Sequence, residues 1–285
     1  MTDTGLTRLD ESALRARLLA RVAPNQIIER ATAIAGDAHR GRLRDEGTPY
    51  VCHVLRTALI LAEELHISDT ERVCAALLHD VLEDGVGIAL EQLRETFGER
   101  VAAMVHCLTD EFKHSGLPRA ERKRLYLQRI AGADDDCLVV KLCDRLDNLR
   151  SLPDSPSLEK REQVSRETRV HLMPGLSQRS GPFSVLNRLL QEALHYEALC
   201  RYRDLRPDCQ LLSDHIEKVL LAMAHCRGIY PIVTARAKSL ESFAEKIQRP
   251  GKVYAVDPVT EITDLCGVRV IVHTLDQVDA MAAAV

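Results

Sequence analysis

The stretch S-D-T-E-R-V-C-A-A-L-L-H-D-V-L-E-D-G, residues 68–85, decides the fold of this 285-residue chain. Ser68 and Glu71 have the spacing of a capping box, and Gly85 is the residue type that commonly ends a helix. Apolar side chains between them recur at helical spacing and predict one buried face; they are Val73, Ala76, Leu77 and Val81. The pattern predicts one helix over residues 68–85, packed inside a helical domain.

Four ionisable side chains lie near the end of this predicted helix. Asp80 shares the apolar stripe, where a buried carboxylate is costly unless a positive charge meets it. His79 precedes it, and Glu83 and Asp84 follow one turn later, so the four form two pairs at i,i+4 spacing. Such a set predicts a metal site with an adjacent base.

The composition, 46% hydrophobic and 28% charged, is that of an ordinary soluble protein of one or two domains. No apolar run approaches the ~18–20 residues that span a bilayer, so no membrane segment is expected. The N-terminus lacks an export signal, and nine cysteines without a C-x-x-C pair indicate free thiols, which predicts a cytoplasmic protein. A net charge of −4 and 4% aromatic residues give no basis for direct nucleic-acid binding.

Helical patterns continue through the first two-thirds of the chain. Thr48 is expected to cap the helix that starts at Pro49, and Pro207 is expected to separate the last two helices. The basic segment 119–130 is either a solvated helix face or a positive rim that draws in a phosphorylated ligand. The other predicted helices cover residues 11–22, 26–38, 89–97, 100–108, 137–152, 158–173, 183–205 and 209–226.

After Gly228 the pattern changes to short β-branched runs at 229–233, 252–256 and 268–273, with helical patterns at 239–247 and 275–285. This alternation predicts the beginning of an α/β domain, and too few strands are present to complete its sheet. The predicted fold is mainly α: an all-helical domain over residues 1–155, a helical connector over 156–205 and an incomplete α/β domain over 206–285.

Polar residues on two further predicted helices extend the candidate metal site. A lone histidine on a helix is more often an ordinary hydrogen-bonded residue than a ligand. The signal strengthens because the polar residues lie on three separate helices, each with its own apolar stripe. Two imidazoles and two carboxylates suit Mn²⁺, Zn²⁺ or Fe²⁺, and predict a metal-dependent hydrolase. The four candidates are His53, His79, Asp80 and Asp144.

The order H…HD…D resembles the HD superfamily of phosphohydrolases, and more specifically the RelA/SpoT family of alarmone hydrolase–synthetases. The matching stretches within residues 31–152 are R-D-E-G-T-P-Y-V-C-H, A-A-L-L-H-D-V-L-E-D, F-G-E-R-V-A-A-M-V and V-V-K-L-C-D-R-L-D-N-L-R. Two later stretches resemble the start of the synthetase; they are R-A-K-S-L-E-S-F-A-E-K and I-T-D-L-C-G-V-R-V-I-V. The remainder of a synthetase is absent, so we expect no synthetase activity.

The resemblance implies an HD-type hydrolase domain followed by a nucleotidyltransferase-like beginning. It implies a Mn²⁺-dependent reaction that removes the 3′-pyrophosphate from ppGpp or pppGpp and gives GDP or GTP. These substrates are small-molecule guanine nucleotides. His53, His79, Asp80 and Asp144 would hold the metal, and Glu83 and Asp84 would orient or deprotonate the attacking water. Arg44 would stack on guanine, while Asn148 and Ser151 would contact the ribose or its 3′ phosphates. Asp264 would bind Mg²⁺ in the synthetase-like part. The oligomeric state is not indicated.

This chain departs from the family pattern at several positions. The usual Lys and Ser after Arg44 are Asp45 and Glu46, where two carboxylates would repel a polyphosphate. Asp147 stands where the family usually has a His, and Gly85 stands where it usually has a Thr. Two alternatives therefore stand beside the ppGpp hydrolase: a regulatory module that binds an alarmone without turnover, and a hydrolase of another 2′- or 3′-phosphorylated nucleotide.

Overall fold

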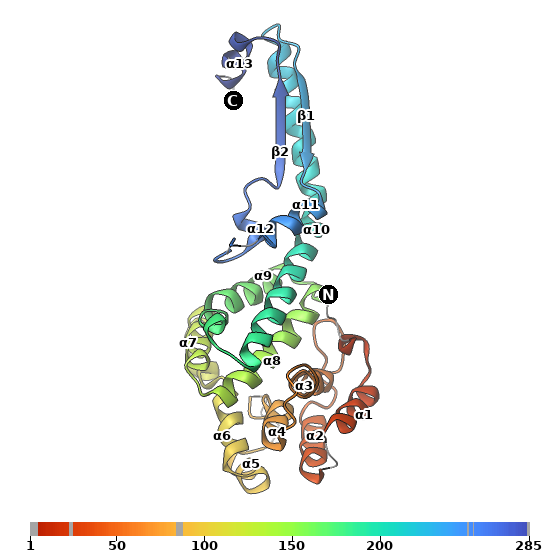
Figure 1. Ribbon diagram of the computed structural model, residues 1–285, viewed down its shortest axis with the longest axis vertical. Helices are drawn as coiled ribbons and strands as arrows, with labels where there is room; N and C mark the ends of the chain where they lie inside the picture. Colours follow the sequence, from red (N-terminus) through yellow and green to blue (C-terminus); the bar gives the residue numbers. More distant parts are fainter. Residues whose placement is uncertain (1–4, 23–24, 84–87, 250, 253, 284–285) are drawn as a thin grey trace. The chain divides into compact units, whose positions relative to one another are not determined.

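The computed structural model describes residues 5–22, 25–83, 88–249, 251–252 and 254–283. The chain is mainly helical, as predicted, and carries one small sheet in its C-terminal part (Figure 1). It divides into two compact units, Met1–Glu197 and Ala198–Val285. The division into three segments at 155 and 205 stays a prediction. Among the described residues, no helix combines the length and apolar character needed to cross a membrane.

Unit one is built from α-helices joined by short turns. The α-helices are α1 (Glu11–Arg21), α2 (Gln26–Ala38), α3 (Tyr50–Leu59), α4 (Thr70–Leu78), α5 (Leu90–Phe97), α6 (Glu99–Leu108), α7 (Arg119–Ala131), α8 (Asp135–Ser151), α9 (Leu158–Glu167) and the first part of α10 (Pro182–His225). Short 3₁₀ or π-helical turns are η1 (Leu6–Arg8), η2 (Ile60–Glu64), η3 (Glu111–His114), η4 (Leu152–Asp154), η5 (Thr168–Leu172) and η6 (Leu176–Gln178).

Helix α8 lies in the middle of unit one, in contact with α3, α4, α6 and α7 (Figure 1). The apolar stripe predicted around α4 is confirmed as buried, and so is the leucine stripe of α8. Polar residues of α8 are also buried, among them Lys141, Asp144 and Asp147. Charged groups inside a protein need partners there, because burying them unpaired is costly. The centre of unit one is therefore where the polar chemistry gathers.

Helix α4 is shorter than predicted at both ends. Ser68 does not cap it; Asp69 does, by accepting from the backbone N–H of Arg72, and an Asp is as good a cap as a Ser. The helix ends at Leu78, and tighter turns follow in which Val81 N–H donates to the carbonyl of Leu78. The predicted i,i+4 helical pair of His79 and Glu83 is therefore wrong, because residues 80–83 lie in turns. Gly85 and Asp84 lie outside the described residues.

Two predictions about prolines are also corrected. Pro49 itself occupies the position before α3, and the Thr48 hydroxyl donates to Glu46 instead of capping the helix. Pro207 does not separate two helices, because α10 continues through it. A proline inside a helix costs about 3 kcal/mol. Burial of Tyr202 and Cys209 on either side of it offsets this cost.

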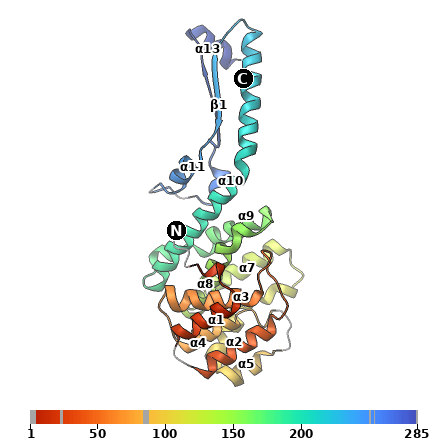
Figure 2. The same ribbon diagram turned by 90° about the vertical axis from the view of Figure 1, so that its right-hand side faces the viewer.

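Unit two contains the rest of α10, β1 (Ile232–Ala237), α11 (Leu240–Ile247), α12 (Pro258–Glu261), β2 (Cys266–Ile271) and α13 (Leu275–Ala282). The strands pair antiparallel, with Val233 opposite Val270. Figure 2 shows β1 beside the second half of α10. Burial alternates along both strands, and Val233 shares a buried cluster with Leu220 and Ala224 of α10. This packing follows the two-residue period of a strand.

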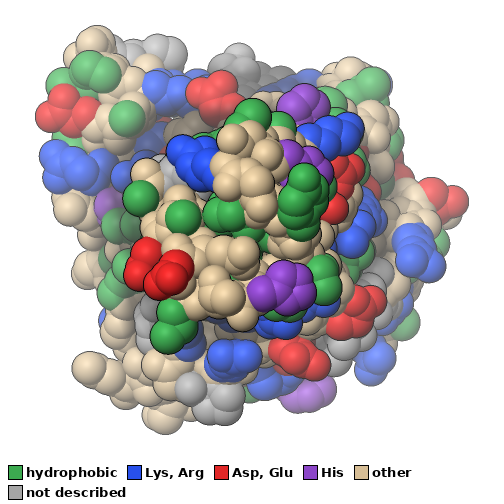
Figure 3. Space-filling view, turned by 90° about the horizontal axis from the view of Figure 1, so that it is seen from above, with side chains coloured by type: hydrophobic (Ala, Val, Ile, Leu, Met, Phe, Trp, Pro, Cys, Tyr) green, Lys and Arg blue, Asp and Glu red, His purple; other side chains and the backbone are tan. Residues whose placement is uncertain are grey.

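The strand predicted at 252–256 is wrong, since none of the described residues of that run lies in a strand and residues 255 and 256 form a bend. The carboxylate of Glu261 accepts the backbone N–H groups of Ala255, Val256 and Asp257, which a strand would need for pairing. On the outer surface of unit two, Tyr230 and Leu275 are exposed. Seen from above, hydrophobic and charged side chains are interspersed and no one type covers that face (Figure 3).

Candidate active site

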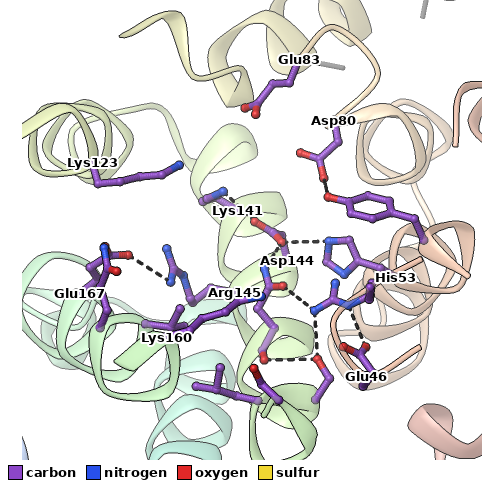
Figure 4. A pocket seen from close by; sticks show the side chains of 18 of the residues that line it. Glu46, His53, Asp80, Glu83, Lys123, Lys141, Asp144, Arg145, Lys160 and Glu167 are labelled. Atoms are coloured by element: carbon purple, nitrogen blue, oxygen red, sulfur yellow. Dashed lines mark hydrogen bonds and ion pairs between the residues drawn. The ribbon is translucent and has the colours of Figure 1, made fainter. Parts of the chain in front are cut away.

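A pocket of about 240 Å³ opens in unit one among α3, α7, α8 and α9 (Figure 4). Its lining is dominated by charged side chains of both signs. The basic ones are Arg44, Arg119, Lys123, Lys141, Arg145 and Lys160, and the acidic ones are Glu46, Asp80, Glu83, Asp144 and Glu167. A lining of this kind suits a ligand that carries phosphate groups together with a cation.

The four predicted metal ligands meet at one wall of this pocket. His53, His79 and Asp80 offer ligand atoms that all lie within 4.8 Å of one another. Asp144 Oδ1 lies 3.2 Å from His53 Nε2 and 3.8 Å from His79 Nε2. The oxygens of Asp144 also accept from Lys141 Nζ at 2.7 Å and from Asn148 Nδ2 at 2.5 Å.

Both imidazoles present Nε2 to this centre. His53 Nδ1 donates to Asp147 Oδ2 at 2.7 Å, and His79 Nδ1 donates to the carbonyl of Ala76 at 2.8 Å. Because a carbonyl and a carboxylate only accept, each ring carries a proton on Nδ1, which leaves Nε2 as the atom that can bind a cation. His79 Nε2 is buried and makes no hydrogen bond within the described part of the chain. A divalent cation would satisfy this nitrogen, so the donor set fits a metal ion.

The charges of the group favour a cation. Burial disfavours ionised Asp80, but His79 outweighs burial and holds the pKa of that carboxyl well below its usual range. Burial likewise opposes ionised Asp144, and Lys141 outweighs it, so this pKa is also strongly lowered. Burial disfavours charged His79, yet Asp80 and Asp144 raise its pKa to about 9. Two ionised carboxylates therefore attract positive charge to His79 Nε2.

Tyr50 belongs to the site although sequence reasoning missed it. Its hydroxyl donates to Asp80 Oδ2 at 2.5 Å. Burial, together with the charge of Asp80, raises the pKa of Tyr50, so the phenol stays a donor. Tyr50 precedes His53 by three residues on α3, a spacing that places both on one helix face and offered the missed signal.

Asp147, the departure from the family's histidine, lies behind His53 and does not line the pocket. Its side chain is 1% exposed and accepts from Arg56 Nε at 2.6 Å and Nη2 at 3.1 Å. Burial opposes its ionisation, but Arg56 outweighs burial and lowers the pKa of this carboxyl strongly. Asp147 therefore orients the imidazole of His53.

Glu83 lines the pocket above Asp80 (Figure 4). Its Oε1 accepts from the backbone N–H of Asp110 at 2.8 Å. Burial, and then the charge of Asp80, raise the pKa of Glu83, and a carboxyl with a raised pKa is suited to proton transfer. The second predicted base, Asp84, lies outside the described residues.

The three predicted substrate-binding residues are in contact with one another. Arg44 Nη2 donates to Asn148 Oδ1 at 2.9 Å and to Ser151 Oγ at 3.0 Å. Its Nε donates to Glu46 Oε1 at 2.8 Å. Two edges of the guanidinium are therefore held, and the flat face of a guanidinium is suited to stacking on a base.

The two acidic departures after Arg44 differ in position. Asp45 is exposed, does not line the pocket, and pairs with Lys160 Nζ at 2.5 Å, and this hydrogen bond lowers its pKa. Glu46 lines the pocket and pairs with Arg44. Both carboxylates have a basic partner, which reduces the repulsion expected for a polyphosphate.

The pocket wall opposite His53 and Glu46 carries mostly basic side chains, with Lys123 and Lys160 labelled there in Figure 4 beside the acidic Glu167. Two residues of the basic segment 119–130, Arg119 and Lys123, line the pocket from α7. Lys141 and Arg145 join them from α8; like Lys160, they were not singled out as site residues from the sequence. The geometry favours the positive-rim interpretation for this part of α7.

Comparison with known proteins supports the same picture. Residues 31–172 match the HD domain family. A solved structure, described as a metazoan ortholog of SpoT that hydrolyses ppGpp, has a TM-score of 0.54 and 30% identity, and the match covers 61% of this chain and 97% of that one. The chain belongs to the RelA/SpoT family. The predicted resemblance is thereby confirmed.

Several curated relatives carry the name guanosine-3′,5′-bis(diphosphate) 3′-pyrophosphohydrolase, among them one from Danio rerio and one from Aquifex aeolicus. The one from Danio rerio is 42% identical to this RelA/SpoT protein over 120 residues, covering 41% of this chain and 64% of the relative. The one from Aquifex aeolicus is 32% identical over 260 residues, covering 88% of this chain and 36% of the relative. The chain thus spans about a third of the length of such bacterial relatives.

In unit two of this RelA/SpoT protein, Asp264 is held by two lysines. Lys246 Nζ lies 2.7 Å and Lys238 Nζ 2.9 Å from its oxygens. Hydrogen bonds from Lys246 and Lys238 lower the pKa of Asp264 to about 2. Its role as a Mg²⁺ ligand stays a prediction.

Proposed function

We propose that unit one is a Mn²⁺-dependent hydrolase that removes the 3′-pyrophosphate from ppGpp or pppGpp, giving GDP or GTP and pyrophosphate. The observation that carries this proposal is the buried Nε2 of His79, which makes no hydrogen bond to the described residues and lies 3.2 Å from Asp80 Oδ2 and close to His53. This group lies at one wall of a pocket that several basic side chains line on the other side. The HD domain match implies a divalent metal ion, and Mn²⁺ is the ion we propose. The names of the relatives support the substrate.

The proposed metal ligands are His53, His79, Asp80 and Asp144. When bound, Mn²⁺ supplies a Lewis acid at the attacked phosphoryl group and lowers the pKa of the attacking water. Tyr50 and Asp147 do not bind the ion in this scheme. They orient Asp80 and His53 through the hydrogen bonds described above.

Glu83 takes a proton from the attacking water, with Asp84 as its proposed helper. The water oxygen attacks the phosphorus bonded to ribose O3′, the bond from phosphorus to O3′ breaks, and O3′ takes up a proton. Lys123 and Arg145 offset the negative charge of the phosphates from the basic wall.

The nucleoside occupies the part of the pocket around Arg44. The guanidinium offers its flat face to the guanine, because two of its edges are already bonded. Asn148 and Ser151 contact the ribose or its 3′ phosphates from the same side of α8. These contacts place O3′ toward Asp144, one turn before Asn148.

The test is chromatography of ppGpp incubated with the 285-residue protein, first with Mn²⁺ and then with excess chelator. We expect GDP and pyrophosphate only with metal, and neither with the Asp80→Asn variant. Glu95→Gln, an exposed change in α5 outside the pocket lining, is the matched control and should keep full activity. Product formation in the presence of chelator, or by Asp80→Asn, would refute the metal site.

The same experiment distinguishes a second candidate function from the hydrolase. The chain keeps two carboxylates after Arg44, which favours a module that binds an alarmone without turnover. Saturable ppGpp binding by calorimetry, with no product at any metal concentration, would replace the hydrolase by this module. Turnover of another 3′-phosphorylated nucleotide in preference to ppGpp would keep the metal site and change the substrate.

A further inference from the structure

Glu46 lines the pocket beside Arg44, and only one of its two carboxylate oxygens is bonded to the described residues. Its side chain is 11% exposed. Oε1 accepts from Arg44 Nε at 2.8 Å and from Thr48 Oγ1 at 3.1 Å. Oε2 accepts no hydrogen bond from the described residues, although the side chain is largely shielded from water. The carboxylate is therefore fixed by one oxygen and available through the other.

The surroundings of Glu46 suit a flat base. The guanidinium of Arg44 is pinned on two edges, by Glu46 and by the side chains of α8, so one face is open to stacking. Leu152, which follows Ser151, adds an apolar side chain to the lining. A ring stacked on Arg44 has Glu46 at the margin of the same guanidinium, within reach of the ring's edge.

We propose that Glu46 selects guanine by accepting hydrogen bonds from its N1–H and its 2-amino group. This inference rests on the proposed function and adds the residue that chooses the base. Guanine has two adjacent donors on this edge, and an ionised carboxylate is an acceptor only. Hypoxanthine keeps N1–H but lacks the amino group, and adenine places an acceptor nitrogen at the N1 position.

The ion pair with Arg44 makes this role compatible with a polyphosphate ligand. The pair is neutral as a whole, so Glu46 can accept from a base without presenting a full unpaired charge to the phosphates. Figure 4 also shows Glu46 on the opposite side of the pocket from Lys123 and Glu167. Asp45 cannot take this role, because it is exposed, lies outside the lining and is bonded to Lys160.

The experiment compares kcat/KM for the 3′,5′-bis(diphosphates) of guanosine, inosine and adenosine, with Mn²⁺. For the unaltered protein we expect guanosine to exceed inosine by about tenfold and adenosine by about a hundredfold, as hydrogen bonds to a charged group permit. Glu46→Gln keeps an acceptor for Arg44 but turns an amide donor toward the base. It should lose about 10–100-fold on guanosine and lose much less, or gain, on adenosine.

Asp45→Asn is the matched control, since it neutralises the neighbouring carboxylate outside the pocket. It should leave the guanosine-to-adenosine ratio unchanged. An equal fall on all three substrates in Glu46→Gln would show that Glu46 only positions Arg44, and would overturn the inference while the proposed hydrolysis stands.

Absence of turnover on all three substrates would refute the proposed function separately. In that case, calorimetry of the binding of the same three compounds without metal still tests whether Glu46 selects the base. Tighter binding of the guanosine compound, lost in Glu46→Gln, supports base selection. Equal binding of all three by the unaltered protein refutes it.

Discussion

Asp147→Asn removes a charge from one of the most buried polar groups in unit one and leaves its size unchanged. The carboxylate accepts from His53 on one side and from Arg56 on the other. An asparagine has one acceptor oxygen and an amino group that only donates, so one of the two partners faces a donor. Arg56, itself 1% exposed, also loses its close counter-charge.

Removing one partner of a buried ion pair costs about 3–5 kcal/mol. For a unit of this size, about 2–4 °C of melting temperature is lost per kcal/mol, so the midpoint should fall by roughly 6–20 °C. Loss of a partner that orients a metal-bound histidine typically weakens metal affinity about 10–100-fold. The same substitution should therefore weaken Mn²⁺ binding by that factor.

The assay is urea unfolding followed by circular dichroism, with Mn²⁺ titration by calorimetry. Adding Arg56→Leu to Asp147→Asn removes the uncompensated guanidinium and frees the asparagine oxygen for His53. The double variant should be more stable, and bind Mn²⁺ more tightly, than Asp147→Asn alone. A loss below about 1 kcal/mol in the single variant, or additive losses in the double, would refute the coupling.

Four further outcomes are expected. Tyr50→Phe removes the donor to Asp80 and should weaken Mn²⁺ binding severalfold by calorimetry, while a melting temperature lowered by more than about 10 °C would show a mainly structural role. Glu83→Gln should lower kcat about 10²–10⁴-fold while Mn²⁺ affinity is retained. Because the pKa of Glu83 is raised, the activity of the unaltered protein should fall as pH drops through that pKa. The pH profile of the variant should lack this fall. Asp264 should titrate near 2 by carboxyl NMR. Since its pKa is lowered in the folded protein, the stability that it contributes is present above about pH 4 and is lost as pH falls toward 2. A titration near 4, the ordinary value, would contradict the ion pairs. Pro207→Ala, at an exposed position inside α10, should raise the free energy of unfolding by about 1–3 kcal/mol in urea, and an unchanged value would mean that the helix carries no cost at the proline.

Local spacing was enough to predict most of the helices and to single out the residues of the proposed metal group. The buried stripe of α4 repeats every three to four residues, and a pattern of that kind depends only on neighbours in the chain. His53, His79 and Asp144 stood out because each is polar on a helix that already has an apolar stripe. The structure brings these three residues together as predicted.

Features decided by distant contacts could not be predicted in the same way. The end of α4 at Leu78 places His79 Nδ1 on the carbonyl of Ala76, and nothing in the local sequence shows that the helix stops there. Asp147 replaces a histidine usual in the family, and the structure places it behind His53, bonded to Arg56. Its partner Arg56 lies 91 residues earlier in the chain, so their pairing is invisible to a local pattern.

Asp144, Asn148 and Ser151 lie about one turn apart on α8, so the helix fixes the distances between them. Asp144, at the metal group, and Ser151, at the nucleoside end, are separated by seven residues, or about 10 Å at 1.5 Å per residue. Under the proposed function this length separates the attacked phosphorus from the base. One residue inserted between Asp144 and Asn148 would turn everything beyond it by about 100° and swing Ser151 away from Arg44. Over this stretch a change in the number of residues is therefore more damaging than a change in their kind.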